Sequence, residues 1–322
     1  MTNISGKLED GQQASRLPKV AILLGSLNGE EFLAEQLESI ARQTHRNWQL
    51  WISDDGSTDL TEAIVGDYAK RWGDKKVALR RGPASGFSAN FLSLVCRAEI
   101  TADYYAFCDQ DDVWEVDKLS RAIGWLATVP PTVPALYCGR TRLVAEDGTE
   151  IGLSPLFNKP PVFANALVQS VAGANTMVFN EPARRLIQFA GADVKIISHD
   201  WWLYLVVSAC GGIVFYDRVP AIRYRQHERN LVGSNMGLRA RLIRLRAAFW
   251  GRFTAWNVRH IAALEQMLPY FTPECREIFW GFVKARERWV LPRCVGILRC
   301  GVFRQTIAGN VGLALASLLG KI

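Results

Sequence analysis

The sequence predicts an α/β fold: a mostly parallel central sheet flanked by helices, followed by a helical C-terminal appendage. Short apolar runs alternate with amphipathic stretches through the first half of the 322 residues. This alternation is typical of parallel strands joined by helices. From Gly237 onward the apolar positions recur with helical spacing, and arginines fall between them.

The first half supplies strands and helices in turn. Val20–Leu24 is apolar throughout, as expected of a strand buried on both faces. Asn28 is predicted to cap the following helix, whose first turn carries Glu30 and Glu31. Further strands are predicted at Trp48–Ser53, Val77–Arg80 and Tyr104–Cys108, with helices at about 59–72 and 88–99.

The second half is less regular until its last quarter. Strands are predicted at Ala135–Val144, Met177–Asn180, Ile213–Tyr216 and Ile222–Arg225, and an apolar helix at His199–Cys210. The last quarter is predicted to form four helices, at Gly237–Trp250, Phe253–Met267, Pro273–Trp289 and Gly296–Leu319. Residues 1–16 are polar and lack periodicity, which predicts a disordered tail.

Charge is distributed unevenly along the chain. Residues 237–322 hold fourteen Lys or Arg and four Asp or Glu, whereas residues 1–236 hold 24 basic and 27 acidic residues. The basic last quarter indicates an anionic partner, either a lipid surface or a nucleic acid. Between residues 238 and 253, arginines alternate with aliphatic and aromatic residues. This composition suits a helix lying in a lipid interface, or equally a helical cap with a basic rim.

Cysteine usage and hydropathy predict a cytoplasmic protein without a membrane span. The seven cysteines form no CxxC pair and several lie in apolar runs, which favours free thiols in a reducing compartment. The N-terminus has no apolar signal segment. The longest uncharged stretches, Trp201–Tyr216 and Gln305–Gly320, are shorter than the ~20 residues that span a bilayer.

Three polar clusters follow predicted strands, at Ser26–Asn28, Asp54–Asp59 and Asp109–Asp112. Ligands of parallel sheets bind beyond the carboxyl ends of the strands, so the clusters predict one shared site. Asp109 and Asp111 can converge on a hard cation, Mg²⁺ or Mn²⁺, that bridges to phosphate oxygens.

The Asp54–Asp59 cluster combines a turn with two adjacent acids. Gly and Ser in this cluster suit a sharp strand-to-helix turn. The turn does not require both Asp54 and Asp55. One of these carboxylates can accept the N3–H of a uracil or thymine ring, and the sequence does not decide which.

Seven stretches between residues 20 and 233 resemble glycosyltransferase family 2, a large group of inverting enzymes with a GT-A fold. They are VAILLGSLNGEEFLAEQLESIARQT, ISDDGSTD, SGFSANFLSL, YYAFCDQDDVWEVDKL, AGANTMVFN, HDWWLYLVVSACG and YRQHERNLVG. FCDQDDVW, HDWW and YRQH resemble the rhamnosyltransferase-type branch of that family. The resemblance implies a GT-A, Rossmann-like catalytic domain over 17–235, with a nucleotide-sugar-binding half at 17–128 and an acceptor half at 129–235. A basic amphipathic helical region would follow at 236–322.

The resemblance also implies roles for residues on the donor side. Ser26, Leu27 and Asn28 would lie against the nucleoside, although the family usually has Thr-Tyr-Asn there and this chain lacks the aromatic ring. Asp54 or Asp55 would contact the base. The remaining donor-side residues are Asn90, Gln110 and Trp114, whereas Lys118 is interpreted as a solvated helix residue.

The same resemblance supplies a metal site and a catalytic base. Asp109 would contact the ribose or the metal, Asp111 would ligate the metal, and His227 would be a third ligand or a diphosphate contact. Asp200 matches the family's base, and its place beside two tryptophans predicts a partly dry pocket that raises its pKa. His199, Trp201 and Trp202 are assigned to acceptor binding, because tryptophan rings stack well on sugars.

These assignments imply an inverting, metal-dependent glycosyltransferase. The branch favours L-rhamnose from dTDP-rhamnose as donor, and a UDP-sugar remains an alternative. The acceptor would be a hydroxyl of a growing, lipid-linked cell-surface polysaccharide. The enzyme would sit peripherally at the inner face of the cytoplasmic membrane, with no nucleic-acid partner.

Three other classes of protein compete with this interpretation. A nucleotidyltransferase would carry a Gly-rich basic phosphate loop after the first strand, whereas this loop, GSLNGEEF, is acidic and short. A nucleic-acid-binding protein would show a recognised motif or an exposed basic stripe, and neither is present in the sequence. A non-catalytic membrane-binding or scaffold protein would have little use for Asp109, Asp111 and Asp200 together.

Overall fold

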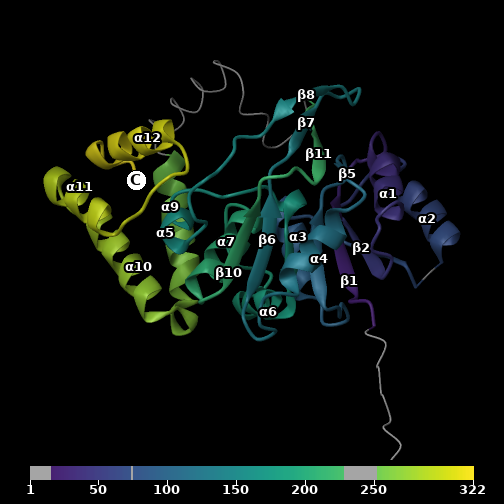
Figure 1. Ribbon diagram of the computed structural model, residues 1–322, viewed down its shortest axis with the longest axis horizontal. Helices are drawn as coiled ribbons and strands as arrows, with labels where there is room; N and C mark the ends of the chain where they lie inside the picture. Colours follow the sequence, from purple (N-terminus) through teal and green to yellow (C-terminus); the bar gives the residue numbers. More distant parts are fainter. Residues whose placement is uncertain (1–15, 74, 228–251) are drawn as a thin grey trace, which may run out of the picture.

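The central element of the computed structural model is a seven-stranded sheet with strand order β10-β6-β9-β4-β1-β2-β3 (Figure 1). The structure describes residues 16–73, 75–227 and 252–322. Only β9 runs antiparallel to its neighbours β4 and β6. The strands are β1 (Val20–Ser26), β2 (Trp48–Asp54), β3 (Val77–Arg81), β4 (Tyr104–Cys108), β6 (Ala135–Gly139), β9 (Val178–Asn180) and β10 (Ile213–Asp217).

β1 is central and is buried on both faces, as its apolar run predicted. Val20–Leu24 are all fully buried. Ala21 and Leu23 belong to one hydrophobic cluster, whereas Val20, Ile22 and Leu24 belong to the other, because successive side chains of a strand point to opposite faces. The sheet is therefore covered on both sides, and the predicted α/β fold with a mostly parallel sheet is confirmed.

Helices cover the two faces of this sheet. The first cluster includes apolar residues of α3, α6 and α7, and the second includes residues of α1, α2 and α4. These helices, with the short α5 and η1, are α1 (Leu33–Ala41), α2 (Thr61–Trp72), α3 (Phe87–Cys96), α4 (Lys118–Leu126), α5 (Phe163–Ala166), η1 (Ala174–Thr176), α6 (Glu181–Ala190) and α7 (His199–Ala209). α1 begins at Leu33 and has Phe32 at its N-cap, so the prediction of Asn28 as its cap was wrong.

A second, four-stranded sheet lies beyond one end of the first (Figure 1). Its order is β5-β11-β7-β8, with β5 (Val113–Trp114), β11 (Ile222–Arg225), β7 (Arg142–Val144) and β8 (Glu150–Leu153). The single strand predicted at Ala135–Val144 was wrong, because the chain leaves the large sheet after Gly139 and enters the small one at Arg142.

The C-terminal part is helical, as predicted, and it packs into the main core. It contains α9 (Arg252–Glu265), η2 (Leu268–Tyr270), α10 (Pro273–Arg286), α11 (Val290–Arg299) and α12 (Ile307–Leu318). Leu264, Phe279 and Phe282 share a hydrophobic cluster with Trp202 of α7. The helix predicted at Gly296–Leu319 is instead two helices, with Gly301 between them in the left-handed region at φ 66°. The helix predicted at Gly237–Trp250 lies outside the described residues.

Two expectations from composition can be compared with the structure. All seven cysteines are free, as the sequence predicted. Within the described part of the chain, no helix combines the length and the hydropathy that crossing a bilayer requires.

Candidate active site

The loop after β4 carries the first two carboxylates of the site. Asp109 and Asp111 leave the carboxyl end of β4, next to the end of β1 in the same sheet. Burial raises the pKa of Asp109, and the nearby charges of Asp111 and Asp200 raise it further. Asp109 and Asp111 thus lie close to Asp200, a third predicted functional carboxylate that comes about 90 residues later in the chain. Because these negative charges are close together and held away from water, the site favours the binding of a cation.

Asp111 contacts His227, which the sequence analysis proposed as a third metal ligand or a diphosphate contact. His227 Nε2 lies 2.8 Å from Asp111 Oδ2, and the imidazole packs against the Phe32 ring with centroids 5.1 Å apart. β11 ends two residues before His227 and thereby positions it beside Asp111. Among the described residues, no set of three or more His, Cys, Asp or Glu is arranged to hold a metal ion. A divalent cation that takes one or two protein ligands and completes its shell with diphosphate oxygens still fits Asp111 and His227, because the crowded carboxylates favour a positive charge.

Arg225 and Asp112 fix the position of this acidic loop, and the sequence analysis assigned neither of them. Arg225 is 4% exposed; its Nε donates to the Asp111 carbonyl and its backbone N–H donates to Asp112. The buried carboxylate of Asp112 also accepts from Asn175 Nδ2. The signals in the sequence were a third acid in DQDD and an arginine at the end of a predicted strand.

Gln110 joins the acidic loop to the loop after β1. Its Oε1 accepts from the Leu27 N–H at 2.9 Å, and its Nε2 donates to the Leu27 carbonyl at 3.1 Å. Gly29 makes this approach possible, since a Cβ there would lie 2.4 Å from Gln110 Oε1. The amide of Gln110 is therefore engaged with the protein backbone, and its half-buried side chain stays a predicted nucleotide contact. The Leu27 side chain is 50% exposed.

Asp54 and Asp55, which the sequence left undistinguished, have different surroundings. Asp54 is 2% exposed, and its carboxylate accepts from Ser26 Oγ, Ser57 Oγ and the backbone N–H groups of Gly56 and Ser57. These four donors use the acceptor positions of a carboxylate. Asp55 is half-buried and, among the described residues, accepts from two backbone N–H groups, at residues 84 and 86. Asp55 therefore keeps capacity for another donor.

Asn28 and Asn90 hold the loops around these acids. Asn28 has φ 49°, a conformation that asparagine tolerates, and its Oδ1 accepts from the Thr58 N–H. Asn90 is 3% exposed and its Nδ2 donates to the Ser53 carbonyl beneath the Asp54 loop. Because Asn90 is buried behind the loop, the structure corrects its assignment as a donor contact.

The start of α7 places Asp200 near the acidic loop. Burial raises the pKa of the Asp200 carboxyl, while hydrogen bonds from Ser198 and from the Trp201 N–H lower it. His199, one residue earlier, stacks on Phe91 of α3 with centroids 4.0 Å apart and meets the Phe107 ring of β4 edge-on at 4.8 Å. The helix is thereby docked onto the strand that leads into Asp109.

The aromatic neighbours of Asp200 do not face an open site, which corrects their assignment to acceptor binding. His199 is 3% exposed, and burial lowers its pKa to about 3. Trp202 has no exposed surface, and Trp201 is 6% exposed with its Nε1 donating to the Ala166 carbonyl. All three side chains pack in the core because all residues of α7 except Asp200 and Ser208 are buried.

Trp114 and Lys118 are also buried, contrary to expectation. Trp114 is 2% exposed in β5, and Lys118 has no exposed surface at the start of α4. Lys118 Nζ lies 3.7 Å from the centre of the Trp114 ring. Burial lowers the pKa of Lys118 to about 7, while Cys108, Asp112 and Asp109 favour its charged form. A cation thus lies behind the acidic loop, where the sequence predicted a sugar-facing ring and a solvated lysine.

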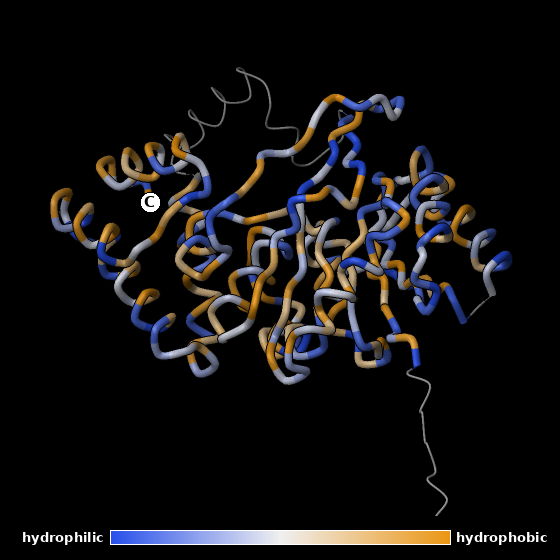
Figure 2. The backbone as a smooth tube through the Cα atoms, viewed as in Figure 1, coloured by the Kyte–Doolittle hydropathy of each residue, from blue (hydrophilic) through white to orange (hydrophobic). Residues whose placement is uncertain are grey.

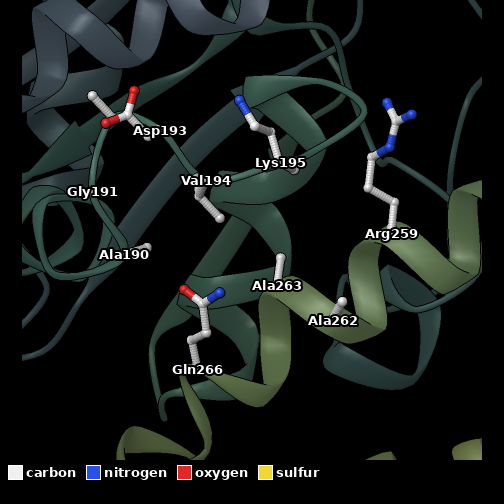
Figure 3. Close-up of a pocket in the computed structure, with 10 residues that line it drawn as sticks. Ala190, Gly191, Asp193, Val194, Lys195, Arg259, Ala262, Ala263 and Gln266 are labelled. Atoms are coloured by element: carbon white, nitrogen blue, oxygen red, sulfur yellow. The ribbon is translucent and has the colours of Figure 1, made fainter.

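A separate pocket lies between the loop that precedes α7 and helix α9 (Figure 3). Its volume is about 510 Å³, and its lining includes Asp193, Lys195, Arg259 and Gln266. None of the carboxylates that meet at the acidic loop lines it. The candidate active site is therefore the carboxyl edge of the sheet rather than this pocket.

The sequence is similar to those of known glycosyltransferases. The family model for glycosyl transferase family 2 matches residues 22–170. The dTDP-rhamnosyl transferase RfbG of Shigella flexneri is 30% identical over 230 residues, which cover 69% of this chain and 78% of that protein.

Two solved glycosyltransferases share the fold. The mannosyltransferase PcManGT from Pyrobaculum calidifontis aligns with a TM-score of 0.53 at 16% identity, covering 95% of this chain and 86% of that one. Residues 1–349 of TarS from S. aureus align with a TM-score of 0.53 at 13% identity, covering 94% and 89%. Both the fold and the sequence relationship lead to one conclusion: the chain is a glycosyltransferase with a GT-A fold and belongs to glycosyltransferase family 2.

Proposed function

We propose that this enzyme transfers L-rhamnose from dTDP-L-rhamnose to an acceptor hydroxyl with inversion at the anomeric carbon. The observation that carries the proposal is the meeting of Asp109, Asp111 and Asp200, where burial, and then the charges of Asp111 and Asp200, raise the pKa of Asp109. The choice of donor is supported by the 30% identity to a dTDP-rhamnosyl transferase. A UDP-sugar is the alternative donor, and the structural relative TarS was solved with UDP-GlcNAc.

The donor nucleoside would lie against the loop after β1. Asp55 is the better candidate for the base, because Asp54 already accepts four hydrogen bonds and Asp55 accepts two. A free acceptor position on Asp55 suits the N3–H of thymine or uracil. The exposed Leu27 and the backbone of Ser26 and Asn28 would supply apolar and polar contacts to the same nucleoside.

Asp200 would act as the general base. Its pKa is raised by burial, which favours proton acceptance near neutral pH. The acceptor oxygen bonds to the anomeric carbon as its proton passes to a carboxylate oxygen of Asp200. The bond from that carbon to the diphosphate oxygen breaks on the opposite face, so the product has the inverted configuration.

A cation beside the acidic loop would stabilise the diphosphate as it leaves. Asp111 and His227, with Asp109 next to them, would hold Mg²⁺ or Mn²⁺, whose charge would offset the negative charge that develops on the diphosphate. The relative PcManGT was solved with GDP-Man and Mn²⁺, which supports this choice of ion.

The acceptor would be a lipid-linked saccharide of a growing cell-surface polysaccharide, used at the inner face of the cytoplasmic membrane. His199, Trp201 and Trp202 would then act indirectly, by holding Asp200 at the mouth of the site. The strongly basic last quarter of the chain supports an anionic membrane surface as partner.

Thermal unfolding in the presence of nucleotides tests this function. Because a ligand that binds the native state raises the melting temperature, dTDP and dTDP-rhamnose with Mn²⁺ are expected to stabilise the protein more than UDP, GDP or nucleotide alone. Asp111→Ala should lose the metal-dependent part of the shift, whereas Asp67→Ala, on the exposed side of α2, should keep it. A larger shift with UDP compounds would name the alternative donor, and no shift with any nucleotide would contradict the proposal.

A further inference from the structure

Helices α11 and α12 each carry large apolar side chains that are exposed in the described part of the chain. Leu291 is 64% exposed and Leu298 78% on α11, whereas Ile307 is 85% exposed and Val311 56% on α12. On α11 these positions are seven residues apart with Val295 between them, and on α12 they are four apart and continue through Leu315. Each set is therefore one stripe along its helix. Monomeric soluble proteins rarely leave such contiguous apolar surface in water.

The opposite sides of the same helices are packed. Ile297 is 4% exposed and Leu313 is 6% exposed, and both belong to the main hydrophobic cluster. Arg293 Nη1 donates to the Ser317 carbonyl at 3.1 Å, which joins α11 to α12. The two helices thus form a helical hairpin. Its inner side is packed in the core, and the exposed stripes take no part in that packing.

The charge around the stripes has a single sign. Residues 288–322 contain five Lys or Arg and no Asp or Glu. Arg288, Arg299 and Lys321 are exposed. Apolar stripes on a segment whose charged residues are all cations match an anionic bilayer surface, where leucines enter the acyl boundary and basic groups meet phosphates.

The same charge argues against other occupants. A second copy of this chain would bring an equally cationic surface into contact with the first. A nucleic acid would gain from the arginines but would leave the leucines and Ile307 in water. From these observations we infer that the outer face of α11 and α12 docks this enzyme on an anionic lipid surface.

The position of the hairpin fits this role. α11 and α12 lie at the end of the molecule opposite α2, and Figure 2 shows hydrophobic segments recurring along both helices. In this view α12 lies toward the side of the molecule on which β1 ends (Figure 1). A bilayer on this face would hold a lipid-linked acceptor on the side of the carboxylate site. The inference rests on the proposed function for its biological meaning, but the surface itself is defined by α11 and α12 alone.

Vesicle binding by the full chain tests the inference. We expect the wild type to co-sediment with phosphatidylcholine vesicles that contain phosphatidylglycerol, and to bind weakly to phosphatidylcholine alone or at high salt. The double variant Leu298→Asp, Ile307→Asp should bind about tenfold or more weakly, because it puts charge into the apolar stripes. Val219→Asp is the matched control: Val219 is 60% exposed in the turn after β10, and this variant should bind within about twofold of the wild type.

The outcomes separate the surface from the catalytic proposal. Stabilisation by nucleotide and Mn²⁺ should be the same in the double variant and the wild type, since neither residue touches the carboxylate site. Failure of nucleotide binding with intact vesicle binding would remove the proposed function and leave the surface. Wild-type protein that ignores anionic vesicles, or a double variant that binds them normally, would overturn the inference. So would a wild-type dimer in solution that the double variant dissociates, because a second copy would then be the occupant.

Discussion

At the scale of single residues, adjacent acids in one motif have different tasks. Asp54 is buried and receives four donors, so it builds the turn between β2 and α2. Asp55 receives two donors and remains partly exposed. The sequence placed both at the strand end, but only the surrounding hydrogen bonds show which carboxylate retains capacity for a ligand.

The two acids are therefore expected to respond differently to the same substitution. Asp54→Asn should lower the free energy of unfolding by about 1–3 kcal/mol, because an amide cannot accept all four hydrogen bonds. Asp55→Asn should lower the melting temperature less and weaken the binding of dTDP by about tenfold. Thermal unfolding and nucleotide titration of both variants measure this. Equal loss of stability with unchanged nucleotide affinity would contradict the division of roles.

Lys118 is a fully buried cation behind the acidic loop, in addition to Arg225. Its ammonium lies over the Trp114 ring and favours the ionised forms of Asp109 and Asp112. Removing it leaves these carboxylates with a higher pKa, so a larger fraction is protonated at neutral pH. A bound cation then has to displace protons, and this cost falls as the pH rises.

Lys118→Met should therefore raise the Mn²⁺ concentration needed for donor binding by about tenfold at neutral pH, and by less at alkaline pH. The measurement is Mn²⁺ titration of donor-induced stabilisation at two pH values. Lys76→Met serves as control, because Lys76 Nζ lies 4.0 Å over the Trp48 ring at β3, remote from the acidic loop. An equal effect of both variants, or none of Lys118→Met, would contradict this role.

At the scale of elements, the start of α7 is the main positioning device. His199 packs between Phe91 and Phe107 and neither ring nitrogen has a hydrogen-bond partner among the described residues. Burial lowers the pKa of His199 to about 3, so the imidazole is neutral in the folded protein near neutral pH. Its contribution is packing that holds Asp200, not proton transfer.

His199→Phe should accordingly keep most of the stability and activity, whereas His199→Ala should cost about 2–4 kcal/mol by leaving a cavity. The pH profile of turnover should show no ionisation of His199 near the usual pKa of histidine. Denaturant unfolding and turnover of both variants test this. A His199→Phe enzyme that is stable but inactive would show that the imidazole does more than pack.

The sequence predicted elements where the pattern was local, and failed where the outcome depended on tertiary structure. β1, β2 and β4 were predicted within two residues because their apolar runs end at polar clusters. The carboxylates at these ends were predicted for the same reason. The run Ala135–Val144 looks continuous, yet it crosses from one sheet to another. Burial of Trp202, Asn90 and Lys118 was missed because a residue type does not show what packs over it.

At the scale of the whole molecule, the catalytic sheet and the C-terminal helices share one core. The main hydrophobic cluster runs from β1 through Trp202 to Phe279 and Phe282 of α10. Trp201 also meets His260 of α9 edge-on, with ring centroids 4.6 Å apart. Residues 252–322 are thus packed as part of the same unit as residues 17–227, although the sequence analysis placed a boundary at residue 236.

A shared core predicts one cooperative unfolding transition. Calorimetry should give a single peak, and fluorescence and circular dichroism should report the same midpoint. Phe282→Ala in α10 should destabilise the whole protein by about 3–5 kcal/mol, including the sheet. Two resolved transitions, with the sheet unaffected by Phe282→Ala, would show that the C-terminal helices are a separate domain.

The most direct test of the whole account is the pH dependence of transfer by Asp200→Asn. Because the base must be deprotonated and burial raises its pKa, kcat/KM of the wild type should rise with pH through a pKa above the usual value for aspartate. Asp200→Asn should bind donor normally, lose about 10²–10⁴-fold in kcat and lose that rise. Asp193→Asn, in the exposed loop before α7, should behave as the wild type. Near-normal turnover by Asp200→Asn with donor bound would contradict the account, since Asp200 would then not be the general base.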